Sequence, residues 1–109
     1  MKVLFLPEVE SYFFALTEIL YEKGYFGFKD SAVKYVRELE DDIRTNLNAK
    51  RKRSAPPFFD RYGKKMLYSV FTKNRDTQWY VFFNVYQENG ETIFLVRFIS
   101  NNHIIAQFL

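Results

Sequence analysis

The sequence contains no cysteine and only one histidine, His103, among its 109 residues. Without thiols the chain cannot form disulfides, thiolate zinc sites or iron–sulfur clusters, and it has no cysteine nucleophile. The other metal-ligating residue types do not group into a metal-binding pattern, and neither a glycine-rich phosphate loop nor a Ser-His-Asp set is present. We therefore expect no metal and no cofactor.

Long hydrophobic runs are absent as well. The uncharged apolar stretches are far shorter than the ~18–20 residues that cross a bilayer. The N-terminal run Val3–Leu6 is followed at once by Pro7 and Glu8, and it is too short for a signal peptide. These observations predict a cytoplasmic protein with no membrane partner.

Aromatic residues, in contrast, are abundant. The chain has thirteen Phe, eight Tyr and one Trp, and 48% of its residues are hydrophobic. This composition is typical of a folded chain and not of a disordered one. The length fits a single domain over residues 1–109, with no room for two independent cores.

The net charge of +3 conceals an uneven distribution along the chain. The segment from Lys50 to Lys65, which we call the basic segment, holds seven basic residues and one acid, Asp60. The rest of the chain holds nine basic and twelve acidic residues. An acidic helical half is therefore followed by one concentrated basic loop, which Pro56 and Pro57 make irregular.

The first part of the chain predicts a strand and a helix. Val3–Leu6 is a short apolar run that suits a first strand. From Val9 to Leu20 the apolar residues recur at three- and four-residue spacing, which is the pattern of one helix face. Gly24 and Gly27 are expected to end this helix.

A second helix is expected to begin at Asp30 or Ser31, because either residue can cap a first turn. Its apolar face consists of Val33, Val36, Leu39, Ile43 and Leu47. Two helices joined by a short segment that contains glycine most simply form an antiparallel hairpin.

From Met66 onward the pattern changes to β structure. Three runs rich in Val, Phe, Tyr and Ile predict consecutive antiparallel strands: Met66–Thr72, Gln78–Tyr86 and Thr92–Ile99. The second turn, at Asn89-Gly90, is a strong hairpin signal. After a polar break, His103–Leu109 is expected to return as a short final strand. The predicted fold class is α+β: an N-terminal strand, a two-helix hairpin and a three- to four-stranded antiparallel sheet.

Two stretches of the predicted sheet are informative beyond their β propensity. They are Thr77–Phe83 in the central strand and Phe98–His103, where a strand meets a short polar break with a histidine. Together with the order and spacing of the elements, they resemble the RelE/ParE toxin superfamily. The resemblance covers nearly the whole chain and implies one RelE/ParE-like domain over residues 1–109.

The resemblance implies that the chain is the toxin of a type II toxin–antitoxin system. One branch of the superfamily cleaves messenger RNA, typically on the ribosome and without a metal. Another branch inhibits DNA gyrase and has no nuclease chemistry. Both are silenced by a cognate antitoxin, so we expect an antitoxin as partner and ribosome-bound mRNA or DNA gyrase as target. A non-toxic binding module on the same scaffold is the third alternative.

If the chain is a metal-independent endoribonuclease, His103 and Arg97 are the candidate catalytic residues. His103 stands where the nuclease branch usually places a catalytic His or Arg, and an imidazole gives and takes protons near neutral pH. Arg97 can hold the scissile phosphate, and strand alternation places it with Leu95 and Ile99 or facing solvent. The structural alternatives are a polar turn for His103 and an ion pair with a neighbouring strand for Arg97.

Some residues depart from the nuclease pattern. The first strand of the predicted meander, which often carries a basic residue in that branch, has no charge between Met66 and Phe71. Gln78 and Phe108 occupy positions where an Arg and a catalytic Tyr are common. The sequence therefore leaves RNA cleavage, gyrase inhibition and simple binding open.

The basic segment is the candidate nucleic-acid-binding region. Cations at this density can follow an RNA phosphate backbone and release its counterions. The aromatic residues between them, Phe58, Phe59 and Tyr62, can stack on bases. The alternative is a solvated loop whose aromatic rings pack into the core. The candidate cations are Lys50, Arg51, Lys52, Arg53, Arg61, Lys64 and Lys65.

Overall fold

The computed structural model describes all residues from 1 to 109 and contains two long helices and one five-stranded sheet. The helices are α1 (Pro7–Glu22) and α2 (Lys29–Asn46), and the strands are β1 (Lys2–Phe5), β2 (Arg53–Ser54), β3 (Leu67–Asn74), β4 (Thr77–Glu88) and β5 (Glu91–Asn101). The shorter helical segments are η1 (Leu47–Ala49), η2 (Pro57–Arg61), α3 (Asn102–Ile105) and η3 (Ala106–Phe108), where η marks a 3-10 helix. The predicted α+β class is confirmed.

The sheet is mixed and not purely antiparallel, with the strand order β1-β5-β4-β3-β2. β3, β4 and β5 form the predicted antiparallel meander. Asn89 and Gly90 turn the chain between β4 and β5, and both have the positive φ that a tight hairpin turn requires. β1 runs parallel to β5, with Val3 opposite Phe94. The two helices between β1 and the meander supply the crossover that a parallel pair needs.

The helices begin at different signals. Pro7 occupies the first turn of α1, where its missing N–H is not needed. α2 begins at Lys29 after Phe28, whose side chain makes no capping hydrogen bond. The prediction that Asp30 or Ser31 caps this helix is therefore wrong. None of the helices combines the length and the apolar character that crossing a bilayer requires.

The C-terminal segment differs from the expectation. His103–Leu109 does not form a strand, because the chain turns into α3 and then η3 after β5 ends. The side chain of Asn101 accepts a hydrogen bond from the backbone N–H of His103 at 2.9 Å and caps this turn. The polar residues that interrupt the strand pattern are therefore a helix-start signal.

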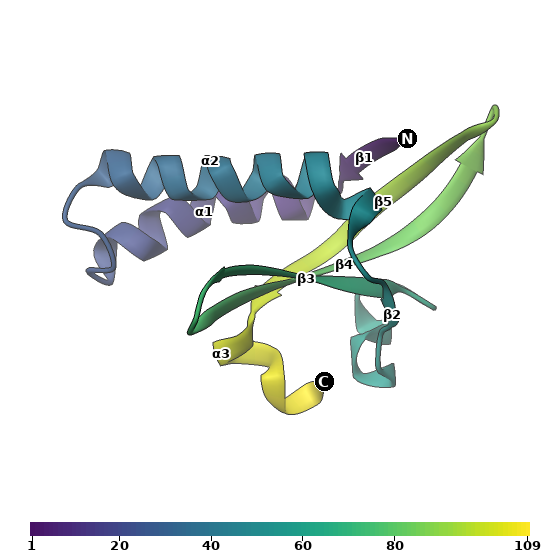
Figure 1. Ribbon diagram of the computed structural model, residues 1–109. Helices are drawn as coiled ribbons and strands as arrows, with labels where there is room; N and C mark the ends of the chain where they lie inside the picture. Colours follow the sequence, from purple (N-terminus) through teal and green to yellow (C-terminus); the bar gives the residue numbers. More distant parts are fainter.

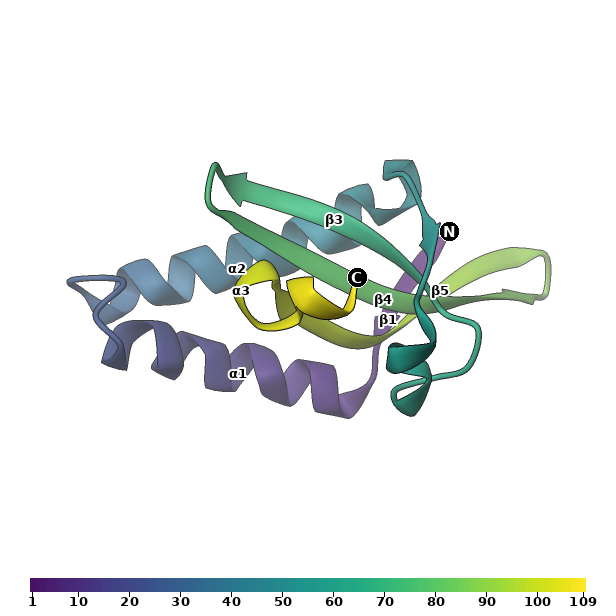
Figure 2. The ribbon, with the colours of Figure 1, turned by 90° about the horizontal axis from the view of Figure 1, so that it is seen from below.

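The sheet lies between two unequal layers (Figure 1). On one side, here called the helical face, α1 and α2 run antiparallel and side by side. On the other side, the loop face, lie η2, α3 and the C-terminus, which Figure 2 shows from below. The helical face buries a cluster of 16 residues that includes Leu39, Ile43 and Trp79. The loop face buries a cluster of five: Phe59, Met66, Tyr68, Phe82 and Ile105.

A β-bulge changes the direction of side chains in β5. The pairing of β4 with β5 shifts between Phe82 and Phe83, and this shift leaves Arg97 as the extra residue on β5. Beyond the bulge, Ile99 packs in the cluster on the helical face. Arg97 contacts the loop face, as described below. The prediction that Arg97 shares a face with Ile99 is therefore wrong.

Candidate nucleic-acid interface

A cleft of about 630 Å³ lies between the beginning of α1, the end of η2 and β5. Two of the predicted cations, Arg61 and Arg97, line it together with Tyr62. One carboxylate, that of Glu8, lies in the opposite wall. The other lining residues are Leu6, Val9, Tyr12, Phe98, Ile99, Ser100 and Ile104. We call this site the arginine cleft, because it brings together two cations that lie far apart in the sequence.

Neutral groups alone hold the side chain of Arg97. Its Nε donates to Asn84 Oδ1 at 2.6 Å, and its Nη2 donates to the Tyr86 hydroxyl at 2.9 Å. The amide nitrogen of the same Asn84 donates to the carbonyl oxygen of Lys64 at 3.0 Å. The expected alternative, an ion pair with an acid on the neighbouring strand, is not formed. The charge of Arg97 therefore has no carboxylate partner, and its other N–H groups remain available to an anion.

The loop after η2 packs directly onto Arg97. A Cβ at Gly63 would lie 2.5 Å from Cδ of Arg97, so the close approach requires glycine at this position. The ring of Tyr62 stacks on Phe98 with 3.8 Å between centroids and 5° between planes. These contacts fix the wall of the arginine cleft that carries Arg61.

Two lysines of the basic segment have structural contacts. Lys52 Nζ donates to the carbonyl oxygens of Leu47, Asn48 and Lys50 at 3.2, 2.9 and 2.9 Å. These carbonyls follow the C-terminal end of α2, where a cation also stabilises the helix dipole. Lys50 Nζ lies 4.9 Å from the centroid of the Phe71 ring. Both lysines are thus partly occupied in holding the end of the helical hairpin.

The remaining cations of the basic segment are exposed: Arg51, Arg53, Arg61, Lys64 and Lys65. The four ion pairs of the structure involve other residues only. Arg61 is positioned without an acid, because its guanidinium lies 4.0 Å from the centroid of the Phe58 ring and its Nε donates to the Phe58 carbonyl. None of these five side chains has an ion-pair partner. Arg61 lines the arginine cleft, and the backbone carbonyls of Lys64 and Lys65 accept hydrogen bonds from Asn84, the residue that holds Arg97.

The aromatic residues of the basic segment do not behave alike. Phe59 is completely buried and stacks on Phe82, with 4.3 Å between ring centroids. Phe58 stacks on Phe108 at 3.8 Å. Tyr62 keeps 37% of its surface exposed. Packing into the core therefore explains Phe59, and Tyr62 is the ring with the most surface left for a base.

His103 lies outside the arginine cleft. It is exposed and lines a second cavity of about 540 Å³, which we call the aromatic cavity. The structure therefore does not bring the two candidate catalytic residues, His103 and Arg97, into one site. The two cavities share Tyr12 and Ile104 in their walls. Burial raises the pKa of Tyr12, and the neighbouring Tyr35 adds to the shift.

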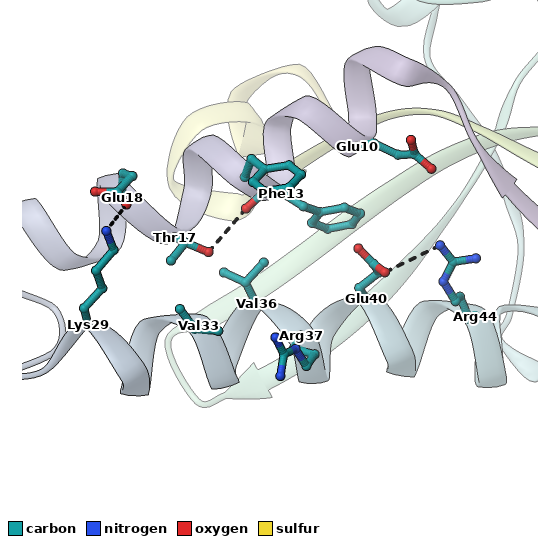
Figure 3. A pocket seen from close by; sticks show the side chains of 11 residues that line it. Glu10, Phe13, Thr17, Glu18, Lys29, Val33, Val36, Arg37, Glu40 and Arg44 are labelled. Atoms are coloured by element: carbon teal, nitrogen blue, oxygen red, sulfur yellow. Dashed lines mark hydrogen bonds and ion pairs between the residues drawn. The ribbon is translucent and has the colours of Figure 1, made fainter.

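A third hollow, of about 450 Å³, lies between α1 and α2 (Figure 3). Its lining contains apolar side chains, among them Val33 and Val36, and charged side chains of both signs. Two ion pairs bridge charged residues here: Lys29 with Glu18, and Arg44 with Glu40. Phe14 also lines this hollow, which we call the helical groove, and is 84% exposed. The sequence pattern did not predict this exposed ring, because it lies outside the periodic apolar face.

The described residues contain no group of three acidic or histidine side chains that could hold a metal ion. The chain matches no protein-family model, no curated protein and no solved structure. The fold and the site therefore define a class only: an α+β domain with a mixed sheet and a cleft between α1, η2 and β5 that carries two arginines and a tyrosine. The RelE/ParE resemblance stays a prediction from the order of the elements.

Proposed function

We propose that this protein is the cytoplasmic toxin of a toxin–antitoxin system and that it acts on RNA, which it binds through the arginine cleft. One observation carries the proposal. Arg61 and Arg97 line the same cleft beside the exposed ring of Tyr62, and neither arginine is paired with a carboxylate.

The chemistry of the cleft fits a single RNA strand. Guanidinium groups bind phosphate oxygens through two parallel N–H donors, and this arrangement gives both strength and direction. A tyrosine ring offers a stacking surface to any base. β2, η2 and the loop before β3 lie at the same end of the molecule (Figure 2), and they carry the further exposed cations Arg53, Lys64 and Lys65. An RNA backbone bound there neutralises several charges at once.

Binding that blocks translation is better supported than RNA cleavage. Cleavage needs a proton-transfer group within hydrogen-bond reach of the reacting hydroxyl. Arg97 and His103 line different cavities, so only an RNA strand that passes over Tyr12 and Ile104 meets both. If such a strand is cleaved, His103→Ala lowers the rate by about 10²- to 10⁴-fold in a translation-coupled assay with chelator present. Equal cleavage rates for the wild type and His103→Ala mean that His103 is not the proton-transfer group.

The binding experiment measures the anisotropy of a fluorescent single-stranded RNA at several salt concentrations. Arg61→Gln weakens binding and makes the logarithmic salt dependence shallower by about one unit. The matched control is Arg75→Gln, an exposed cation in the turn between β3 and β4. An equal loss in both variants contradicts a localised site, and absence of binding by the wild type contradicts the proposal.

A cognate antitoxin is part of the same proposal. A partner that silences RNA binding has to cover the exposed cations, so we expect an acidic, amphipathic segment. Coexpression with the protein encoded by the adjacent reading frame tests this. A stable complex that no longer binds RNA supports the proposal, and a complex that binds RNA unchanged contradicts it.

One observation favours the second candidate, a non-catalytic inhibitor of DNA gyrase. The helical groove presents Phe14 almost fully to solvent, and exposed apolar side chains beside a hollow often meet a partner protein. A gyrase supercoiling assay distinguishes the two functions. Inhibition that Phe14→Ser abolishes and Arg61→Gln leaves intact supports this candidate over the RNA-binding one.

A further inference from the structure

The aromatic cavity adjoins the arginine cleft, with which it shares Tyr12 and Ile104, and it is lined by none of the exposed arginines proposed for RNA. The helical hairpin extends beyond the end of the sheet, and the tip of the β3–β4 hairpin and α3 lie beneath it (Figure 1). The cavity of about 540 Å³ is lined from both sides of this overhang. Its volume lies in the range of about 300–1,000 Å³ that is common for sites of small molecules.

The walls are mainly aromatic and aliphatic. Tyr12 and Leu16 come from α1, Phe26 from the connection between the helices, and Trp79 from β4. The rings of Tyr12 and Trp79 meet edge to face with 6.5 Å between centroids. Such walls favour a flat apolar ligand, because aromatic rings pack well edge to face or offset.

A hydroxyl group is oriented within this apolar lining. Trp79 Nε1 donates to the hydroxyl oxygen of Tyr35 at 2.9 Å. Since the Tyr35 oxygen accepts this bond, its own proton is directed away from Trp79 and is available to an acceptor. The Tyr12 hydroxyl, which burial keeps protonated, is a second donor on the wall.

The one charged side chain that lines the cavity is positive. It is Lys23, which lines the cavity together with the imidazole of His103, and no Asp or Glu does. Both side chains belong to exposed residues, and Lys23 takes part in none of the ion pairs of the structure. The helical groove, with acids and bases in its lining, contrasts with this arrangement. A ligand that fits the aromatic cavity therefore needs a polar group that is an anion or a hydrogen-bond acceptor.

We propose that the aromatic cavity binds a small aromatic carboxylic acid. The ring lies among Tyr12, Phe26 and Trp79, and the carboxylate points to Lys23 and His103. This assignment gives His103 a role in binding that does not depend on RNA cleavage, and it stands independently of the proposed function.

The sequence supplies a direct reporter of binding. Trp79 is the single tryptophan of the chain and lines the cavity, so its fluorescence responds to an occupant. The probe is 3-phenylpropanoate, and the matched control ligand is the neutral 3-phenylpropan-1-ol. We expect a saturable change in Trp79 emission with the acid and about tenfold weaker binding of the alcohol, because the alcohol lacks the charged acceptor.

Variants at Lys23 and His103 complete the test. Lys23→Gln combined with His103→Gln weakens binding of the acid about ten- to hundredfold and leaves binding of the alcohol unchanged. Lys34→Gln, which removes an exposed lysine of α2 that does not line the cavity, leaves both affinities unchanged. Circular dichroism verifies that the variants remain folded.

Three results overturn the proposal. They are equal affinities for acid and alcohol, an unchanged affinity for the acid in the double variant, and neither a fluorescence change nor calorimetric heat at millimolar acid. The RNA anisotropy experiment is independent of all three, so each proposal can fail without the other.

Discussion

The two faces of the sheet are built by different means. The helical face carries two long helices, and apolar contacts among 16 buried residues hold them. The loop face carries short helical turns over a cluster of five buried residues. Side-chain hydrogen bonds to backbone carbonyls add to this smaller core, among them Asn84 to Lys64 at 3.0 Å and Arg61 to Phe58 at 3.0 Å.

This difference separates stability from chemistry. The apolar side chains of the helical face form most of the core and stabilise the fold, but they offer few groups that could react or bind a polar ligand. The loop face places the guanidinium groups of Arg61 and Arg97 beside the stacked ring of Tyr62, and it does so with few buried side chains. We infer that substitutions on the loop face lower the stability of the fold less than those on the helical face, because less of the core depends on the loop face.

The first prediction compares the same Ile→Ala substitution in the two cores, which we expect to lose different amounts of stability. Ile43→Ala, on the helical face, is expected to lower the free energy of unfolding by about 4 kcal/mol, and Ile105→Ala, on the loop face, by about 2 kcal/mol. Ile43 is enclosed by long elements, whereas the one-turn α3 that carries Ile105 can move into the space left behind. Urea unfolding followed by circular dichroism measures both. Equal losses contradict the distinction between the faces.

The second prediction concerns the hydrogen bonds of the loop face. Asn84→Ala removes the acceptor of Arg97 and the donor to the Lys64 carbonyl, so we expect a loss of about 2 kcal/mol and weaker RNA binding. Gln87→Ala, which removes an exposed hydrogen bond to Thr92 on the same strand pair, is the control and changes stability by less than about 0.5 kcal/mol. Unfolding and RNA titrations of both variants decide. If Asn84→Ala has normal stability, Asn84 does not stabilise the loop face through its bonds to Arg97 and Lys64.

The third prediction divides the basic segment itself. Lys52→Ala leaves three carbonyls at the end of the helical hairpin without their cation, and costs about 1.5 kcal/mol with little change in the salt dependence of RNA binding. Arg53→Ala, at an exposed position, leaves stability within about 0.5 kcal/mol and makes the salt dependence shallower. Thermal unfolding and anisotropy give both quantities. The reverse pattern means that Lys52 contacts RNA.

The smallest expected effect is a pH dependence on the helical side. The pKa of Tyr12 is raised above 10.0 in the folded protein, chiefly by burial. Above about pH 10 the unfolded chain loses this proton more readily than the folded one, so stability falls as pH rises through the folded pKa. Unfolding curves at about pH 8 and about pH 11 show the decrease, which Tyr12→Phe makes smaller. An identical decrease in the variant assigns it to other groups.

Sequence periodicity predicted the elements better than their arrangement. The apolar spacing located both helices and the three strands of the meander, because one buried face determines which residues are apolar. The parallel pairing of β1 with β5 joins residues that are far apart, and no local pattern encodes it. The capping role of Asn101 was missed because a polar break after a strand signals a turn and a helix start equally.

The candidate site was predicted in its composition but not in its grouping. Charge density identified the basic segment, and Arg61 and Arg97 do line one cleft. The bulge at Arg97 depends on the pairing of two strands, so simple alternation wrongly placed Arg97 on the same face as Ile99. Sequence also could not separate Lys52, whose Nζ is bound to carbonyl oxygens, from the exposed cations beside it. His103 is separated from Arg97 because the chain turns into α3. The prediction of a final strand over His103–Leu109 missed this turn.

The parallel pairing of β1 also sets an order of events during synthesis. Lys2 to Phe5 pair with Ile93 to Val96, so the first strand has no partner until almost the whole chain has been made. The helical hairpin that follows β1 is synthesised long before the meander that covers its apolar side. Until then the ribosome-bound chain exposes both an unpaired strand and an uncovered helical surface, features that favour aggregation. A chain interrupted before β5 is therefore expected to depend on chaperones or to be degraded.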